Sequence, residues 1–221
     1  KVAGAMDMRG VARTVLVSSI LFMVVTGIAY PLATTGVAQL VFRDQAQGSL
    51  VERGGKAVGS AVIGQNFTKP EYFHPRPSTT VGADPADSSK TVDQPYNAAS
   101  SGASNQGAIS KKLIEQVTAR AEAYRKENGL APNTPVPVDA VTASGSGLDP
   151  EISVANAKLQ IQRVARARGV SADQISTLLA QQTSPRQLGV LGDPRVNVLQ
   201  LNLALDASIK AQPSAAQPAA R

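Results

Sequence analysis

The chain of 221 residues contains no cysteine and no tryptophan, and it has a single histidine, His74. Without cysteine there can be no disulfide, no thiolate metal ligand and no cysteine nucleophile. One histidine cannot build a zinc site that depends on several imidazoles, and it leaves little room for a Ser-His hydrolase. The composition therefore excludes most thiol and imidazole chemistry, and we expect no metal site.

Aromatic residues are scarce as well, with four phenylalanines and four tyrosines, although the formal net charge is +6. A positive charge can serve nucleic-acid binding, but here the lysines and arginines are scattered and form no basic stripe. So few aromatic rings do not supply a platform on which bases could stack. We therefore expect no nucleic-acid partner.

Charged residues are missing altogether from Thr14 to Phe42. A helix needs about 20 apolar residues, at roughly 1.5 Å each, to cross a bilayer, and residues 14–37 supply them. Arg9 and Arg13 precede this segment, so the positive-inside rule keeps the N-terminus in the cytoplasm. The sequence predicts a single-pass protein of the cell (inner) membrane whose C-terminal domain is extracytoplasmic.

The predicted organisation has four parts: a cytoplasmic N-terminus at 1–13, a transmembrane helix at 14–37, an extracytoplasmic domain at 38–210 and a disordered tail at 211–221. A cleaved signal peptide is the alternative for the first two parts, with small residues at 36–38 as the cleavage site. The apolar run exceeds a usual signal-peptide core and continues past that site, which favours a retained anchor.

The sequence of this domain predicts a mixed α+β fold, in which helices accompany a small sheet. Gly54-Gly55 predicts a two-residue hairpin turn, because both glycines accept a positive φ. Residues 64–105 are rich in Gly, Pro, Ser, Asn and Asp and predict a long irregular region. Irregular regions of this length inside a domain are commonly functional or ordered by a partner.

Apolar periodicity predicts helices at about 107–128, 149–168 and 171–182. Gly129 and Gly169 are expected to end the first two, and Ser171 and Gln174 form a capping-box signature at the start of the third. Residues 195–209 are ambiguous: their apolar residues fit a helix, and a short strand is possible at 196–198. The second helix is expected to open with Asp149 as N-cap and Pro150 at the first helical position. The inward face predicted for it consists of Ile152, Ala155, Leu159 and Val164.

Two segments resemble functional sites, but each has a simpler interpretation. The segment "TASGSGLDP" at 142–150 offers Gly and Ser amides ahead of a predicted helix, an arrangement that can cradle phosphate. It lacks the lysine of a P-loop, so a flexible capping loop is the preferred interpretation. His74 has no second histidine or cysteine to converge with, so a structural role is preferred over a ligand or base. No catalytic set of nucleophile, base and orienting residue can be assembled, and we assign no catalytic residue.

Several motifs in order along the chain resemble the C subunit of the Kdp-type potassium-transporting P-type ATPase. They include "YPLATTGVAQLVF", "IGQNFTKPEYFHPRPS", "SSGASNQG", "VTASGSGLDPEIS" and "VNVLQLNLALD". Glu151 stands where the family often has His or Asn, and "SNQG" replaces a more usual "SNLG". The resemblance runs from Tyr30 to Asp206.

The resemblance implies an accessory, non-catalytic subunit of a potassium uptake complex. Its implied partners are a channel-like subunit that takes up potassium, a P-type ATPase subunit that hydrolyses ATP, and a small hydrophobic subunit. It also implies a "catalytic chaperone" that raises the ATP affinity of the hydrolysing subunit, with a nucleotide contact at Gln160. We expect no cofactor on the chain alone, and ATP only in complex with the hydrolysing subunit.

The residues alone predict that Gln160 is a polar residue on a helix whose opposite face is core. The predicted topology also conflicts with a direct nucleotide contact, because no ATP pool exists outside the cytoplasm. An effect on ATP affinity would then act through the membrane subunits as coupling between two states. We expect the segment at 64–78 to face a partner and to help seat the domain above the channel-like subunit, its aromatic rings anchoring it to the domain or to a neighbour. The candidate residues are Phe67, Tyr72, Phe73, Arg76 and Pro77.

Two other functions stay open. The first is a membrane-anchored extracytoplasmic binding module whose Gly/Ser loops hold a small anion or sugar. The second is a secreted hydrolase-like protein, which requires that the apolar segment be a cleaved signal.

Overall fold

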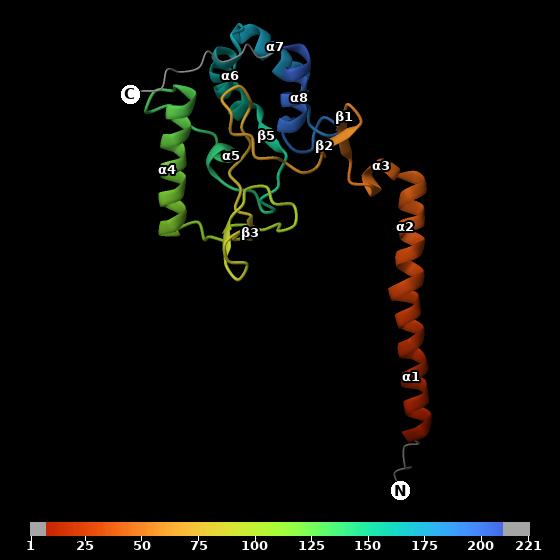
Figure 1. Cartoon of the computed structure of the whole chain (residues 1–221). Coiled ribbons are helices and arrows are strands. Elements are labelled where there is room, and N and C mark those ends of the chain that lie inside the picture. The colour runs from red at the N-terminus through yellow and green to blue at the C-terminus, as the bar shows by residue number, and fades with distance from the viewer. Residues whose placement is uncertain (1–7, 210–221) are drawn as a thin grey trace. The chain divides into compact units, whose positions relative to one another are not determined.

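The computed structural model describes residues 8–209 and divides the chain into an N-terminal segment up to Leu50 and a domain from Val51 onward (Figure 1). The N-terminal segment is one long helix, followed by the short helix α3 (Arg43–Ala46). The long helix consists of α1 (Met8–Val24), a π-helical turn η1 (Val25–Ala29) and α2 (Tyr30–Val41).

In the described part of the chain, Arg9–Val41 is the one helix long and apolar enough to cross a membrane, with a mean hydropathy of 2.1 in its best window. It is longer than the predicted 14–37. Pro31 does not end it: proline lacks the N–H of an α-helical bond, and the π-helical turn lies just before it, where the Tyr30 N–H bonds to the Val25 carbonyl.

The strands of the domain are short. β1 (Leu50–Arg53) and β2 (Lys56–Ser60) pair across Gly54-Gly55, whose φ angles of 60° and 74° confirm the predicted turn. β3 (Val81–Ala83) and β4 (Thr91–Asp93) form a second antiparallel pair inside the long irregular region. A third sheet has the order β5-β7-β6 and is antiparallel throughout, and its strands are Glu151–Ser153, Arg195–Asn197 and Thr183–Ser184.

Five helices complete the described part of the domain: α4 (Lys111–Asn128), α5 (Val138–Val141), α6 (Val154–Arg168), α7 (Ala172–Gln181) and α8 (Val198–Ser208). Two predicted ends are confirmed, because Gly129 and Gly169 cap α4 and α6 in the left-handed conformation. The predicted capping box of Ser171 and Gln174 opens α7. α6, α7 and α8 lie together in Figure 1. The mixed α+β fold is therefore confirmed.

The predicted start of α6 at Asp149 is wrong. Residues 151–153 form strand β5, which pairs with β7, and the helix begins only after Ser153. The Ser153 side chain is the true N-cap and accepts from the Asn156 N–H at 3.0 Å. Pairing of β5 with the distant strand β7, in which Glu151 lies opposite Asn197 and Ser153 lies opposite Arg195, therefore overrides a local helix signal. The predicted inward face is wrong at Ala155, which is exposed.

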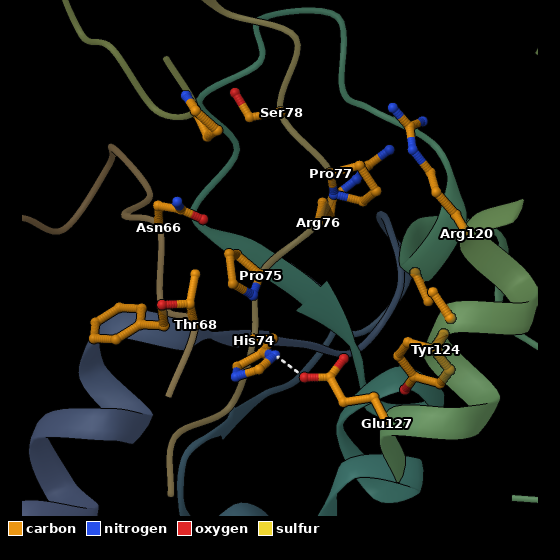
Figure 2. Close-up of a pocket in the computed structure, with 14 residues that line it drawn as sticks. Asn66, Thr68, His74, Pro75, Arg76, Pro77, Ser78, Arg120, Tyr124 and Glu127 are labelled. Carbon is orange, nitrogen blue, oxygen red and sulfur yellow. Dashed lines mark ion pairs between the residues drawn. The ribbon is translucent and has the colours of Figure 1, made fainter. Parts of the chain in front are cut away.

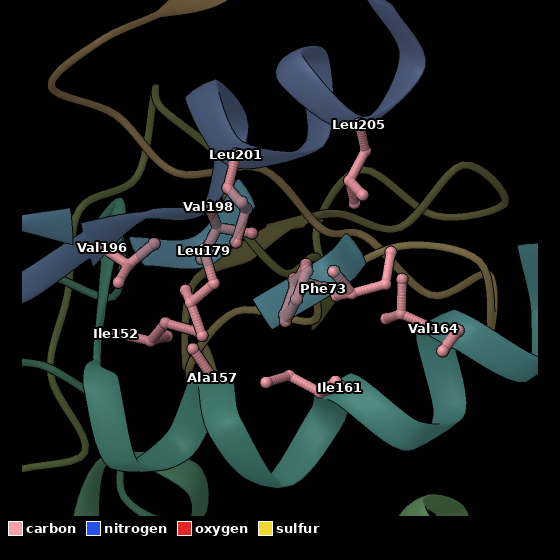
Figure 3. Close-up of a cluster of buried hydrophobic side chains, with 12 residues drawn as sticks. Phe73, Ile152, Ala157, Ile161, Val164, Leu179, Val196, Val198, Leu201 and Leu205 are labelled. Atoms are coloured by element: carbon pink, nitrogen blue, oxygen red, sulfur yellow. The ribbon is translucent and has the colours of Figure 1, made fainter. Parts of the chain in front are cut away.

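The core lies between α6, α7, α8 and the β5-β7-β6 sheet (Figure 3). Phe73 reaches into its middle from the irregular region and is 0% exposed. Its neighbours in the cluster include Ile152, Ala157, Ile161, Val164, Leu179, Val196, Val198, Leu201 and Leu205. Through Phe73 the irregular region contributes to the core, so packing against α6, α7 and α8 fixes the position of its backbone there.

Candidate functional site

Residues 64–78 are held inside the domain by two buried amide side chains. Asn202 of α8 binds the Phe73 backbone twice, accepting from its N–H at 2.8 Å and donating to its carbonyl at 3.0 Å. Gln160 of α6 does the same for His74, accepting from its N–H at 2.7 Å and donating to its carbonyl at 3.1 Å. The two amides therefore satisfy backbone groups as neighbouring strands would in a sheet.

Gln160 is 1% exposed and lies in the core. We expected it on a polar face opposite the core, and that expectation is wrong. Its amide also donates to Asn156 Oδ1 at 2.9 Å and accepts from Arg163 Nη2 at 2.7 Å. With both N–H donors and both lone pairs occupied, the side chain has no hydrogen-bonding capacity left for a nucleotide.

Two arginines of α6 bind carbonyl groups of the same segment. Arg163 Nη1 donates to the carbonyls of Pro70 at 2.7 Å and Tyr72 at 2.9 Å, and Arg168 Nε donates to that of Glu71 at 2.8 Å. Desolvation lowers the pKa of Arg163, because burial disfavours the charged form of the guanidinium group. Backbone carbonyls thus accept hydrogen bonds from both buried guanidinium groups, beside the carboxylates of Glu127 and Asp206.

Tyr72 takes part in an internal network. Its hydroxyl donates to Asp206 Oδ2 at 3.1 Å, and Arg168 pairs with Asp206 Oδ1 at 2.9 Å while lying 5.1 Å from the ring centroid of Tyr72. Burial and the carboxylate of Asp206 raise the pKa of Tyr72. The hydroxyl and one face of the Tyr72 ring are therefore both in contact with other residues of the domain.

A cleft of about 380 Å³ lies between this segment and α4 (Figure 2). His74 Nδ1 forms an ion pair with Glu127 Oε1 at 2.8 Å, drawn dashed in Figure 2, and His74 Nε2 lies 2.9 Å from the Lys69 carbonyl. The hydrogen bond from His74 lowers the pKa of Glu127. The ion pair connects the segment to α4. The other residues that line the cleft include Asn66, Phe67, Thr68, Arg76, Pro77, Ser78 and Arg120.

Two arginines line the cleft. Arg76 Nη1 donates to Asp149 Oδ2 at 2.7 Å, so a carboxylate of the domain neutralises this charge. Arg120 donates to the Val141 carbonyl at 3.1 Å and has no carboxylate within ion-pair distance among residues 8–209. Arg120 is therefore the cation of the cleft best placed to meet an external anion.

Backbone N–H groups of the Gly/Ser segment 142–150 donate hydrogen bonds to serine side chains of the same segment. The Gly147 N–H donates to Ser144 Oγ at 2.9 Å, and the Leu148 N–H donates to Ser146 Oγ at 3.1 Å. No helix N-terminus follows directly, because β5 intervenes. The segment therefore lacks the features of a phosphate cradle. Over residues 8–209, no group of three or more His, Asp or Glu side chains could hold a metal.

The structure brings together part of the predicted partner-binding set. Phe67, Arg76 and Pro77 line the cleft. Phe73 belongs to the core and Tyr72 is bound to Asp206. These two rings anchor the segment to the domain, which is one of the two alternatives raised for them.

A family model described as the c chain of K+-transporting ATPase, KdpC, matches residues 12–207. The chain belongs to the KdpC family. It is 57% identical over 196 residues to a protein of Rhodopseudomonas palustris strain TIE-1, covering 89% of this chain and 96% of that one. It is 53% identical to a protein of Methylobacterium nodulans (88% and 95% covered) and 55% identical to one of Mycobacterium bovis BCG (85% and 93% covered). All three are called potassium-transporting ATPase KdpC subunit.

Several residues that build the site in this chain are absent from the sequence prediction. The charged groups of the site include Glu127, Arg120 and Arg163. Charged residues on helices usually face solvent, so their charge alone offers no reason to select these three. One signal was available: Asn156, Gln160 and Arg163 recur at intervals of four and three, which places polar groups on one face of α6.

Proposed function

We propose that this chain is an accessory, non-catalytic subunit of an ATP-driven potassium uptake complex and that it assembles or stabilises the other subunits. The observation that carries the proposal is the family match over residues 12–207, which spans both the apolar helix and the domain. The organisation of the domain agrees with it, because its polar groups hold an irregular segment in place instead of converging on a reacting atom.

The domain lies outside the cytoplasm in this proposal. Arg9 and Arg13 flank the N-terminal end of the apolar helix, and no charged residue follows before Arg43. This asymmetry keeps the N-terminus in the cytoplasm by the positive-inside rule. The partners are then the channel-like subunit, the P-type ATPase subunit and the small hydrophobic subunit of the same cell-membrane complex.

Any effect of this subunit on ATP affinity is indirect. Gln160, the residue that family resemblance suggests as a nucleotide contact, is buried with its amide fully hydrogen-bonded. The catalytic chaperone role therefore operates by favouring one conformation of the membrane subunits, a coupling that is typically worth about 1–3 kcal/mol.

The cleft beside α4 is the proposed seat for a partner subunit. Arg120 offers a cation without an internal carboxylate, and Phe67 and Pro77 supply apolar area next to it. A carboxylate from an extracytoplasmic loop of the channel-like subunit fits this combination.

Affinity purification through a tag on this chain tests the proposal. The other three subunits should co-purify with potassium-stimulated ATPase activity, and Arg120→Ala should lower their recovery while leaving the chain folded. Arg125→Ala is the matched control: Arg125 lies on the same helix, and its Nε donates to the Thr134 carbonyl at 2.8 Å.

Recovery of the wild-type chain without any other subunit would contradict the proposed function. Recovery of the whole complex with Arg120→Ala would contradict only the assignment of the cleft. An anion- or sugar-binding module, the alternative function, would instead purify alone and bind such a ligand.

A further inference from the structure

The only histidine of the chain lines the cleft beside α4, and both of its ring nitrogens face oxygen atoms (Figure 2). His74 Nδ1 lies 2.8 Å from Glu127 Oε1, and His74 Nε2 lies 2.9 Å from the Lys69 carbonyl oxygen. A neutral imidazole carries one N–H and can donate to only one of these oxygens, whereas the imidazolium form donates to both. The observed contacts are therefore complete only when the ring carries two protons.

A third neighbour gives the neutral ring a different set of contacts. Arg163 Nη1 of α6 lies 3.4 Å from His74 Nε2 and carries only donors. When the ring loses one proton, the N–H at Nδ1 keeps the charge-assisted bond to Glu127, and the lone pair at Nε2 faces the positive guanidinium group. The opposite neutral tautomer would place a lone pair 2.8 Å from the carboxylate oxygen. The ring thus has two states, which differ in the partner of Nε2.

The other charged and titratable side chains that line the cleft keep one state between about pH 5 and pH 8. Arg76 and Arg120 carry guanidinium groups, which proteins do not deprotonate. Burial raises the pKa of Tyr124 far above its ordinary value. The hydrogen bond from His74, which both states of the ring keep, lowers the pKa of Glu127. His74 is therefore the residue of the cleft whose charge varies in this range.

Loss of the proton makes the cleft less positive by one charge. With the ring charged, His74 neutralises Glu127, and Arg120 remains to meet an external anion. With the ring neutral, the Glu127 carboxylate offsets the charge of Arg120 inside the same cleft. An external carboxylate is therefore attracted more strongly when the ring is protonated.

We propose that His74 is a pH sensor in the seat of the partner subunit, and that its protonation at low extracytoplasmic pH strengthens binding of the partner's carboxylate. This inference rests on the proposed function, which supplies the partner and the side of the membrane. Histidine is the side chain whose charge ordinarily changes between about pH 5 and pH 8. The binding is reciprocal, so a carboxylate bound in the cleft also favours the charged ring.

The state of the ring can be measured directly, because one histidine gives one set of ring signals. The full chain, made without a polyhistidine tag and with ¹⁵N-labelled histidine, is studied by NMR in detergent. We expect imidazolium at about pH 5.5 and the neutral tautomer protonated at Nδ1 at about pH 8. One state at both pH values overturns the proposal, and so does a neutral tautomer protonated at Nε2.

The complex shows whether this proton affects the partner. Dissociation of the chain from the immobilised complex is measured at about pH 6 and about pH 8, for wild type and for His74→Gln, whose amide does not titrate. We expect wild type to dissociate at least about threefold faster at the higher pH, and His74→Gln to lose this ratio. Lys112→Gln is the matched control, because it removes a charge at an exposed position of α4 and should keep the wild-type ratio.

The ratio of the two rates separates binding from folding. Each variant is compared with itself at two pH values, so a general loss of stability in His74→Gln does not imitate the expected result. Equal ratios for wild type and His74→Gln overturn the pH sensor and leave the proposed function intact. Failure of the wild-type chain to co-purify at either pH overturns the proposed function as well.

Discussion

Single side chains of α6 and α8 determine the path of an irregular segment that is far away in the sequence. Gln160 and Asn202 bind the backbone of His74 and Phe73 across separations of 86 and 129 residues. A buried backbone group that loses its partner costs about 1–3 kcal/mol, so each amide affects stability strongly.

Replacing Gln160 by leucine should therefore destabilise the domain. Gln160→Leu removes the partners of the His74 N–H and carbonyl, and we expect a loss of about 3 kcal/mol. For a domain of this size that lowers the melting temperature by roughly 6–12 °C. Thermal unfolding of the full chain in detergent measures it. Gln162→Leu, at an exposed position of the same helix, is the control and should melt like wild type.

The ion pair between His74 and Glu127 predicts a dependence on pH. The pKa of Glu127 in the folded domain lies below its ordinary value of 4.5, first because of the hydrogen bond from His74. A lowered carboxyl pKa contributes stability above the unfolded value and loses it as the pH falls through the folded value.

Glu127→Gln should accordingly melt below wild type at about pH 6, and the difference should shrink towards about pH 3.5. The effect is small, because the Glu127 side chain is 42% exposed and solvent screens the pair. A difference that stays constant between the two pH values would contradict this role.

At the scale of elements, two loops depend on close approach between their backbones. The Gly64 N–H donates to the Leu148 carbonyl at 2.8 Å. A Cβ at Gly64 would press on the ring of Tyr96 and lie 2.7 Å from the Asp149 carbonyl oxygen. The Gly/Ser segment 142–150 therefore acts as a support for the start of the segment 64–78.

Gly64→Ala should destabilise the domain by about 1–3 kcal/mol, because the Asp149 backbone would have to shift. Gly102→Ala is the matched control, since a Cβ there meets nothing within 4 Å. Urea unfolding of both variants in detergent gives the comparison. Equal stability of the two would show that the loops are not held this closely.

The elements that the sequence predicted correctly are those fixed by local chemistry. Gly54-Gly55 forms the turn, Gly129 ends α4, and Ser171 with Gln174 opens α7. The start of α6 was wrong, because pairing of β5 with β7 decides the conformation of residues 151–153. The composition of residues 64–78 predicts an irregular segment, but the side chains that hold it come from α6 and α8. Spacing places Asn156, Gln160 and Arg163 on one face of α6, but it does not show which distant segment they bind.

At the scale of the whole molecule, the proposed topology separates the domain from the ATP pool. The full chain in detergent should therefore show no saturable heat on titration with ATP. A dissociation constant below about 1 mM would contradict an indirect role and would make direct nucleotide binding the better explanation of any effect on ATP affinity.

The side of the membrane on which the domain lies decides whether any effect on ATP affinity must be indirect. Thr118 is exposed on α4, and a Thr118→Cys variant carries the only cysteine of the chain. Intact spheroplasts are treated with a membrane-impermeant maleimide before and after lysis. An extracytoplasmic domain should be fully labelled before lysis. Labelling only after lysis would place the domain in the cytoplasm and contradict the proposed topology.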